Sequence, residues 1–199
     1  VLLLTAHIWR TNLSGLTREV RKTIRIQHYN LKAKHTCKIA LVADLHDHPY
    51  SQIIDSFRAE HTDYIAVNGD LLYAAVPGHS IYEHVPESRQ HFKYTQYAQY
   101  FLKEAVKIAP VLFSTGNHEL YLDEGDRELL SNLGVIFLDD SFCNFGDLVF
   151  GGLSSSYKYL ANTGTSSTRE EHQIKWNTVF DKVNTDWLAE LAPLSVLSP

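Results

Sequence analysis

The chain has 199 residues, of which 44% are hydrophobic and 12% aromatic, enough to bury the core of one domain. Its formal net charge is −5, and its 18 Lys and Arg residues form no basic stripe, which argues against nucleic acid as a partner. Only two cysteines are present, Cys37 and Cys143, far apart in the chain, so neither a disulfide framework nor a zinc ribbon is predicted.

The first residues are apolar, and the sequence contains no Met. Val1–Trp9 is much shorter than the ~20 residues that a membrane-spanning helix needs. Two alternatives stay open for this segment: the tail of a membrane anchor whose front is missing, or a buried edge or stray apolar end of the domain. We therefore interpret residues 1–22 as an N-terminal extension or a remnant of a membrane anchor, and residues 23–199 as one domain.

Strands are predicted from two kinds of hydrophobic pattern. Alternation of polar and apolar residues predicts a half-buried strand at Thr23–Tyr29. Short continuous apolar runs are typical of strands covered on both faces. These runs lie at Lys38–Ala43, Tyr64–Val67 and Val111–Phe113, and two further strands are predicted at Val135–Leu138 and Leu148–Phe150.

Helical spacing of apolar residues predicts helices between these strands. The helices are expected around Ile53–Phe57, from Phe92 to Ile108, from Arg127 to Leu133 and within Glu170–Leu191. The aromatic residues between Phe92 and Phe101 are expected to face the core. Repeated alternation of strands and helices predicts an α/β domain. A polar insertion between Tyr73 and Arg89 interrupts this pattern and is expected to be a surface loop.

Three of the apolar strands run directly into polar clusters. These clusters are Asp44-Leu45-His46, Gly69-Asp70 and Gly116-Asn117-His118-Glu119. Asp and Asn often cap strand ends and turns, but capping alone does not explain three such clusters. The carboxyl ends of parallel strands meet at one edge of a sheet, so the clusters are expected to converge. Mixed nitrogen and oxygen ligands of this kind suit Zn, Fe or Mn better than Ca.

The order of these clusters between Lys38 and Glu119 resembles the calcineurin-like metallophosphoesterase family, especially its bacterial phosphodiesterase-type branch. The resemblance implies an α/β/β/α sandwich and a centre of two divalent or trivalent transition-metal ions, Mn, Fe or Zn. It assigns Asp44 and His46 to the first ion, Asp70 as a bridge, and Asn117 to the second ion. His118 would not be a ligand; it would contact the scissile phosphate or protonate the leaving oxygen.

The implied activity is metal-dependent hydrolysis of a phosphodiester or phosphomonoester, with a small-molecule or lipid-linked substrate. Asp70 is followed by Leu-Leu-Tyr73 and lacks the Asp and Arg that the serine/threonine protein phosphatases place just after this position, which disfavours that activity. The family completes its site with later histidine motifs, and after Phe145 this chain has only His172, expected to be a surface residue. The sandwich is therefore expected to be incomplete at the C-terminus. The alternatives are a non-catalytic scaffold of the same fold or an inactive fragment.

The remaining polar residues near the motifs are assigned as follows. His48 is a secondary candidate that either faces the substrate or lies in an exposed loop. His79, His84 and His91 are expected to be solvent-exposed. Glu119 is expected to support the backbone of its motif and not to bind metal. Location is open between membrane-associated and cytoplasmic, and oligomeric state is not predicted.

Overall fold

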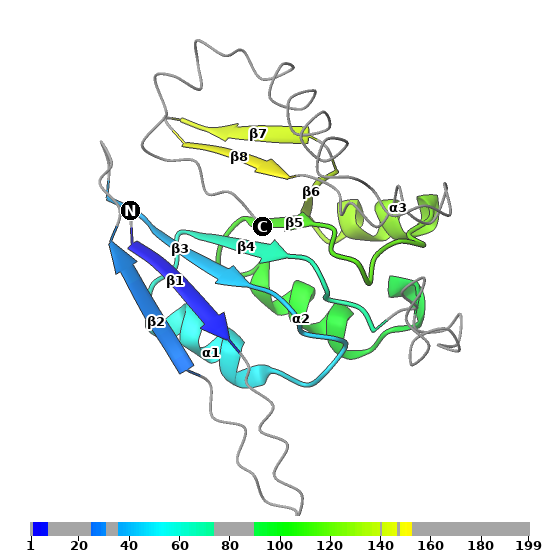
Figure 1. Ribbon diagram of the computed structural model, residues 1–199, viewed down its shortest axis with the longest axis horizontal. Coiled ribbons are helices and arrows are strands. Elements are labelled where there is room, and N and C mark those ends of the chain that lie inside the picture. Colours follow the sequence, from blue (N-terminus) through cyan, green and yellow to red (C-terminus); the bar gives the residue numbers. More distant parts are fainter. Residues whose placement is uncertain are drawn as a thin grey trace, which may run out of the picture.

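The computed structural model describes residues 2–7, 25–30, 36–73, 90–139, 141–146 and 148–152, and contains a main sheet of six strands in the order β2-β1-β3-β4-β5-β6 (Figure 1). Its strands are β1 (Leu2–His7), β2 (Arg25–Asn30), β3 (Lys38–Val42), β4 (Tyr64–Asn68), β5 (Val111–Ser114) and β6 (Ile136–Leu138). β1 pairs antiparallel with β2, and all other neighbours in this sheet are parallel. The strands predicted within 23–138 are thus confirmed.

The apolar start of the chain is part of this sheet. β1 lies between β2 and β3, and Leu2 to Ala6 pair residue by residue with Lys38 to Val42. Within the segment Val1–Trp9, the structure thus shows Leu2–His7 as a strand of the sheet.

The two faces of β3 and β4 pack against different layers, because side chains alternate along a strand. Ala40 and Val42 belong to the main buried cluster, which is shared with the helices. Ile39 and Ala66 belong to a second cluster together with Leu148 of a small two-stranded sheet. That sheet consists of β7 (Ser141–Phe145) and β8 (Leu148–Gly152), paired antiparallel. The predicted strand at 148–150 is confirmed, whereas β7 was not predicted.

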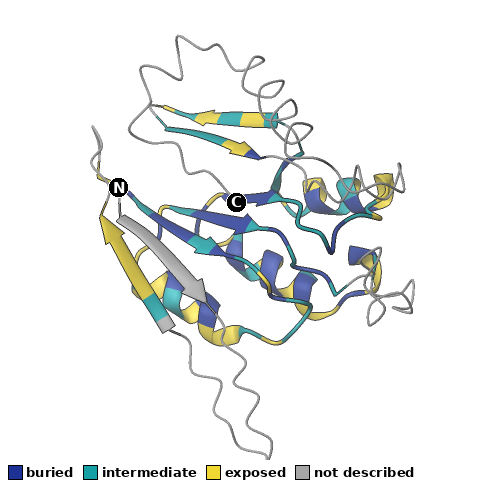
Figure 2. Ribbon diagram, in the orientation of Figure 1, coloured by how far each residue is buried: buried dark blue, intermediate teal, exposed yellow. Residues whose placement is uncertain are grey.

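In the part of the chain that the structure describes, three α-helices and a short 3₁₀ helix pack their buried sides into the main cluster (Figures 1 and 2). They are α1 (Ser51–Ala59), η2 (Phe92–Tyr94), α2 (Tyr97–Ala105) and α3 (Glu124–Asn132). Helices, main sheet and small sheet supply three layers of the predicted α/β/β/α sandwich, and the α/β class is confirmed. The helix predicted within 170–191 lies outside the described residues.

The predicted helix from Phe92 to Ile108 is wrong in its first part. η2 ends at Tyr94. The next residue, Thr95, has an extended backbone and its hydroxyl donates to the Phe92 carbonyl oxygen over 2.8 Å, so the α-helix begins only at Tyr97. This break changes which aromatic residues are buried. Phe92 and Phe101 are in the core as predicted, but Tyr94 and Tyr100 are each 54% exposed.

None of the helices in the described part of the chain combines the length and the apolar character needed to cross a membrane.

Candidate metal centre

The three polar clusters lie in loops that follow β3, β4 and β5, at the carboxyl edge of the main sheet (Figure 1). The first two loops are joined by backbone hydrogen bonds. The His46 amide donates to the Asp70 carbonyl oxygen over 2.9 Å, and the Asp47 amide donates to the Leu71 carbonyl oxygen over 2.8 Å. These bonds continue the pairing of β3 with β4 beyond the strands and fix one loop against the other.

Several residues of these loops have left-handed backbone conformations. Asp44, His46 and Asp70 have φ angles of 59°, 49° and 54°. Positive φ is uncommon for residues other than glycine and costs free energy, and such conformations cluster at functional sites. Asp is among the residues that tolerate this region best, whereas His in this conformation indicates that the surrounding contacts hold it there.

Gly69 and Gly116 allow the loops after β4 and β5 to approach each other closely. A Cβ atom on Gly69 would overlap the backbone of Gly116, and a Cβ atom on Gly116 would lie 2.6 Å from the Asp70 nitrogen and overlap its carboxylate. Any side chain at either position would therefore push the loops apart. The two glycines of the motifs are needed for this contact and not only for local turns.

The buried carboxylate of Glu119 connects the same two loops. Its Oε2 accepts hydrogen bonds from the amides of Asp70 (2.8 Å) and Gly116 (2.7 Å), and its Oε1 accepts one from Leu72 (2.9 Å). Burial raises the pKa of Glu119 to about 7, the nearby charge of Asp70 adds to the rise, and the three amide bonds oppose it. These contacts agree with the predicted role of Glu119 as a support for the backbone.

His46 is oriented by a hydrogen bond of the kind that fixes metal-binding histidines. Its Nδ1 lies 3.1 Å from the Leu72 carbonyl oxygen. Because a carbonyl oxygen only accepts, Nδ1 carries the proton, and the lone pair is on Nε2. Nε2 lies 3.8 Å from Oδ1 of Asp44, whose side chain is 68% exposed. His46 and Asp44 thus present an imidazole nitrogen and a carboxylate oxygen to the same small volume.

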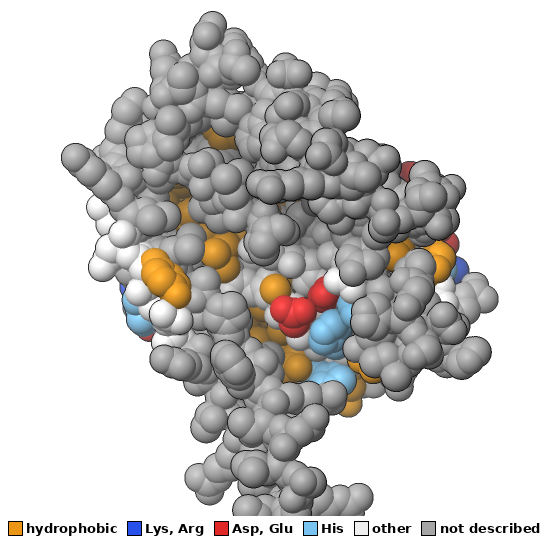
Figure 3. All heavy atoms as spheres, in the orientation of Figure 1, with side chains coloured by type: hydrophobic (Ala, Val, Ile, Leu, Met, Phe, Trp, Pro, Cys, Tyr) orange, Lys and Arg blue, Asp and Glu red, His pale blue; other side chains and the backbone are white. Residues whose placement is uncertain are grey.

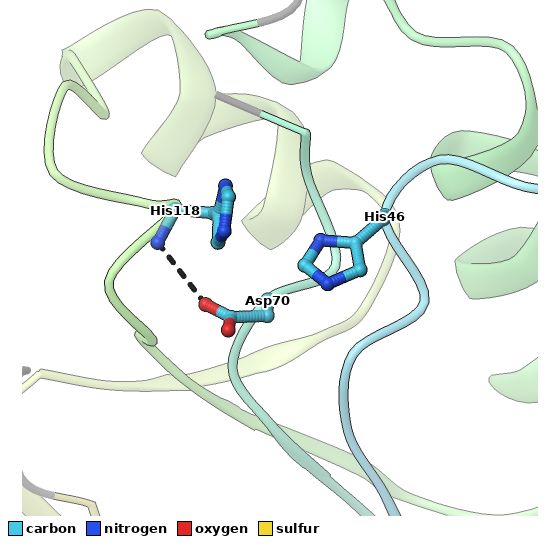
Figure 4. A group of neighbouring side chains, drawn as sticks. All are labelled: His46, Asp70 and His118. Carbon is cyan, nitrogen blue, oxygen red and sulfur yellow. Dashed lines mark hydrogen bonds between the residues drawn. The ribbon is translucent and has the colours of Figure 1, made fainter. Parts of the chain in front are cut away.

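Asp70 lies between the two histidines, as Figure 4 shows. One ligand atom from each of His46, Asp70 and His118 lies within 4.8 Å of the other two. Oδ1 of Asp70 accepts the backbone amide of His118 over 3.0 Å. Burial raises the pKa of Asp70, while the amide of His118 and the neighbouring histidines lower it. In Figure 3, acidic and histidine side chains lie next to one another on this face of the molecule.

The remaining predicted residues, Asn117 and His118, lie in the loop after β5. Asn117 is half-buried in the loop between Gly116 and His118. His118 itself is buried, and its ring centroid lies 4.7 Å from that of His46. The distances allow His118 to ligate an ion as well as to contact a substrate, so the division of roles implied by the resemblance stays a prediction.

Tyr73 is a neighbour of the centre that sequence reasoning did not assign to it. Its ring stacks on His118 with centroids 5.9 Å apart and meets the edge of His46 at 5.7 Å. Its place three residues after Asp70 was the only signal in the sequence, since the contact depends on how the loops fold together.

Of the other histidines considered in the sequence, His48 and His91 lie in the described part of the chain. His48 donates from Nδ1 to the His46 carbonyl oxygen over 2.8 Å, and its ring stacks on Tyr50. The prediction that His91 is solvent-exposed is wrong, because His91 is 9% exposed and its Nδ1 is 2.7 Å from the Asp126 carboxylate. His79, His84 and His172 lie outside the described residues.

His91, Asp123 and Asp126 form a second group with the spacing of metal ligands. The Asp126 carboxylate is already held by the ring of His91 and by the amides of Phe92 and Asp123, at 2.7 to 3.1 Å. These bonds join η2 to the start of α3, so the group has a structural role.

The residues at the strand ends fit a transition metal. They provide an imidazole nitrogen with its lone pair on Nε2, an exposed carboxylate, a half-buried carboxylate and an amide oxygen, which are the donor types that Mn, Fe and Zn accept. The backbone supports of His46 and Asp70 are the outer contacts that keep such ligands in place.

Comparison with known proteins identifies the family of the chain. The sequence model described as calcineurin-like phosphoesterase matches residues 37–196, which is most of the chain. The protein therefore belongs to the calcineurin-like phosphoesterase family, and the family and fold implied by the resemblance are confirmed. No curated protein and no solved structure matches the chain.

Proposed function

We propose that this protein hydrolyses a phosphodiester or phosphomonoester with a centre of two transition-metal ions, Mn, Fe or Zn. The observation that carries the proposal is the convergence of His46, Asp70 and His118, from three separate loops, on one point at the carboxyl edge of the sheet. Membership of the calcineurin-like phosphoesterase family suggests metal-dependent phosphoester hydrolysis as the reaction class. The number of ions and the assignment of each ligand are part of the proposal.

Four residues are proposed to hold the ions: Asp44 and His46 for the first, Asp70 between the two, and Asn117 for the second. Asp70 suits the shared position because a carboxylate has two oxygens, and the His118 amide fixes one of them at 3.0 Å. When bound, the metal supplies Lewis acidity that activates water and neutralises charge on the phosphate. Glu119 and the two glycines keep the ligand loops at the required separation.

His118 is proposed to bind the phosphate or to give a proton to the leaving oxygen. An imidazole can carry and release a proton near neutral pH, which suits both roles. Its buried ring packs against the rings of both His46 and Tyr73, so its position is defined before the substrate arrives. A small-molecule or lipid-linked substrate is proposed, since the net charge of −5 gives no attraction for a polyanion.

The proposal is tested by metal content and by hydrolysis of a chromogenic phosphodiester, bis(p-nitrophenyl) phosphate, with added Mn²⁺. We expect about two equivalents of metal per chain, and a loss of hydrolysis of at least about a hundredfold in Asp70→Asn. The matched control is Asp55→Asn, which alters an exposed carboxylate on α1 paired with Arg58 and should keep full activity.

Two results would count against the proposal. Full activity in Asp70→Asn would remove the proposed centre from the reaction. Metal binding without hydrolysis of any phosphoester would favour the alternative, a non-catalytic scaffold of the same fold.

A further inference from the structure

The carboxylate of Asp47 connects the ligand loop after β3 to a helix that lies about fifty residues further along the chain. Its Oδ1 accepts hydrogen bonds from the backbone amides of Tyr97, over 3.0 Å, and Ala98, over 2.8 Å. These are the first two amides of α2. Asp47 comes directly after His46, so the residue that reaches α2 is the neighbour of a proposed metal ligand.

The helix α2 does not provide this cap from its own sequence. The residue before it, Gln96, makes no side-chain capping bond, and no acidic residue lies in the first turn. The first amides of a helix have no partner within the helix, and its N-terminus attracts negative charge. Asp47 therefore supplies both an acceptor and a negative charge that α2 would otherwise lack.

Asp47 is also fixed from the opposite side, by the loop after β4. Its amide donates to the Leu71 carbonyl oxygen over 2.8 Å, and its φ angle is 49°. α2 is anchored in the core through Phe101 and Leu102, which are at most 4% exposed. The loop that carries Asp44 and His46 is thus held both by a helix that is anchored in the core and by the Asp70 loop.

We infer that Asp47 is a positioning residue for the metal centre: by capping α2, its carboxylate holds the left-handed turn at His46 in the geometry that binds metal. The inference rests on the proposed function, because it takes Asp44 and His46 as ligands. It assigns Asp47 no contact with metal or substrate.

The first experiment uses the unsubstituted 199-residue chain and follows hydrogen exchange of single amides with and without Mn²⁺. If the turn and α2 are coupled through Asp47, Mn²⁺ slows exchange at Tyr97 and Ala98, because coupling between two sites acts in both directions. The matched control is the Lys38 amide, which donates to the Asp63 carboxylate over 2.7 Å at the opposite end of β3 and should not respond. Unchanged exchange at Tyr97 and Ala98 on binding of Mn²⁺ would overturn the inference.

The second experiment measures Mn²⁺ affinity in variants of Asp47. Asp47→Gly removes the carboxylate but permits the positive φ, and we expect its affinity to fall by about 10–100-fold, as for other outer supports of metal ligands. Asp47→Asn keeps an acceptor and tolerates the same backbone, so it should bind Mn²⁺ almost as tightly as the unsubstituted chain. Asp63→Gly removes a carboxylate that accepts the Lys38 amide at the start of β3, far from the centre; it should lower the melting temperature and leave the affinity unchanged.

The outcomes separate the two proposals. Absence of Mn²⁺ binding in the unsubstituted chain would refute the proposed function and this inference together. Equally tight Mn²⁺ binding in the unsubstituted chain and in folded Asp47→Gly would refute the inference alone. A loss of Mn²⁺ affinity in Asp63→Gly as large as that in Asp47→Gly would also refute it. Where Asp47→Gly does not fold, the exchange experiment decides.

Discussion

At the scale of single residues, the centre depends on a few buried polar contacts that have no substitute. Glu119 is the main case, because one carboxylate satisfies three amides that belong to two loops. A buried amide that loses its acceptor costs about 1–3 kcal/mol. Glu119 therefore contributes to stability and to site geometry through the same bonds.

We predict that Glu119→Ala lowers the free energy of unfolding by roughly 3 kcal/mol, since three amides lose their acceptor at once. Denaturant unfolding followed by circular dichroism measures the change. Glu128→Ala, on the exposed surface of α3, is the matched control and should change stability by less than about 0.5 kcal/mol. A similar small effect in both variants would contradict the role given to Glu119.

The close contact between the loops after β4 and β5 gives a second prediction. Gly116→Ala should cost about 1–3 kcal/mol and weaken Mn²⁺ binding, because the new methyl group displaces the Asp70 carboxylate. Gly151→Ala is the control: the position is exposed in β8, and no heavy atom lies within 4 Å of the added carbon. Calorimetric titration and thermal unfolding measure both effects. Unchanged Mn²⁺ affinity in folded Gly116→Ala would mean one of two things. Either Asp70 is not a ligand, or the loops adjust to the methyl group without a change in the free energy of binding.

The candidate residues were predictable from sequence because each follows a recognisable buried strand, and parallel strands bring their carboxyl ends together. The contacts that support these residues were not predictable from the sequence. The Tyr73 ring on His118 and the Asp47 carboxylate on Ala98 join residues about fifty positions apart, and no local pattern encodes such pairs. The burial of His91 has the same cause, since its partner Asp126 lies on α3.

At the scale of elements, α3 begins with a reciprocal cap. The Asp123 carboxylate accepts the Asp126 amide over 2.9 Å, and the Asp126 carboxylate accepts the Asp123 amide over 3.1 Å. The pKa of Asp123 lies below its ordinary value of 3.8, first because of the bond from the Asp126 amide and further because of His91 and Lys93. The charged form of Asp123 is thus favoured in the folded protein.

We predict that this cap makes stability dependent on pH in the acid range. A carboxyl group whose pKa is lower in the folded state stabilises the fold above its unfolded pKa, and this stabilisation is lost as pH falls through the folded pKa. Asp123→Asn keeps an acceptor for the amide but does not titrate. The difference in melting temperature between the two proteins should therefore be largest near neutral pH and shrink below about pH 4. A difference that is constant with pH would contradict the prediction.

The elements themselves show where sequence patterns suffice. The inner strands were predicted because their apolar runs are continuous, as in Val111–Phe113. β7 was not predicted because none of the residues Ser141–Phe145 is fully buried, so the hydrophobic pattern of this strand is weak. The start of α2 was misplaced because the extended Thr95 and the cap from Asp47 depend on contacts outside the helix.

At the scale of the whole molecule, the contact between the two sheets encloses Cys37. This thiol belongs to the buried cluster of Ile39 and Ala66, against which Leu148 and Phe150 pack. Burial raises the pKa of Cys37 and also that of the half-buried Cys143. Only the thiolate reacts with alkylating reagents, so both burial and the raised pKa slow the reaction.

We predict that iodoacetamide near pH 8 labels Cys37 far more slowly in the folded protein than in guanidinium, and more slowly than Cys143. Mass spectrometry of the two cysteine peptides over time measures both rates. Equal labelling of Cys37 in folded and unfolded chains would mean that the small sheet does not stay packed on the main sheet.

The strand order of the main sheet has a consequence for self-association. β3 is an apolar strand, Lys-Ile-Ala-Leu-Val, and on one side its backbone pairs with β1, which pairs in turn with β2. The outermost strand is therefore Arg-Ile-Gln-His-Tyr-Asn, whose residues from Gln27 to Asn30 are exposed. An unpaired apolar edge invites strand exchange with other copies, whereas a polar edge resists it. β1 and β2 thus cover the apolar edge of β3, and a chain shortened to begin at Thr36 would expose β3 to other copies as a template for aggregation.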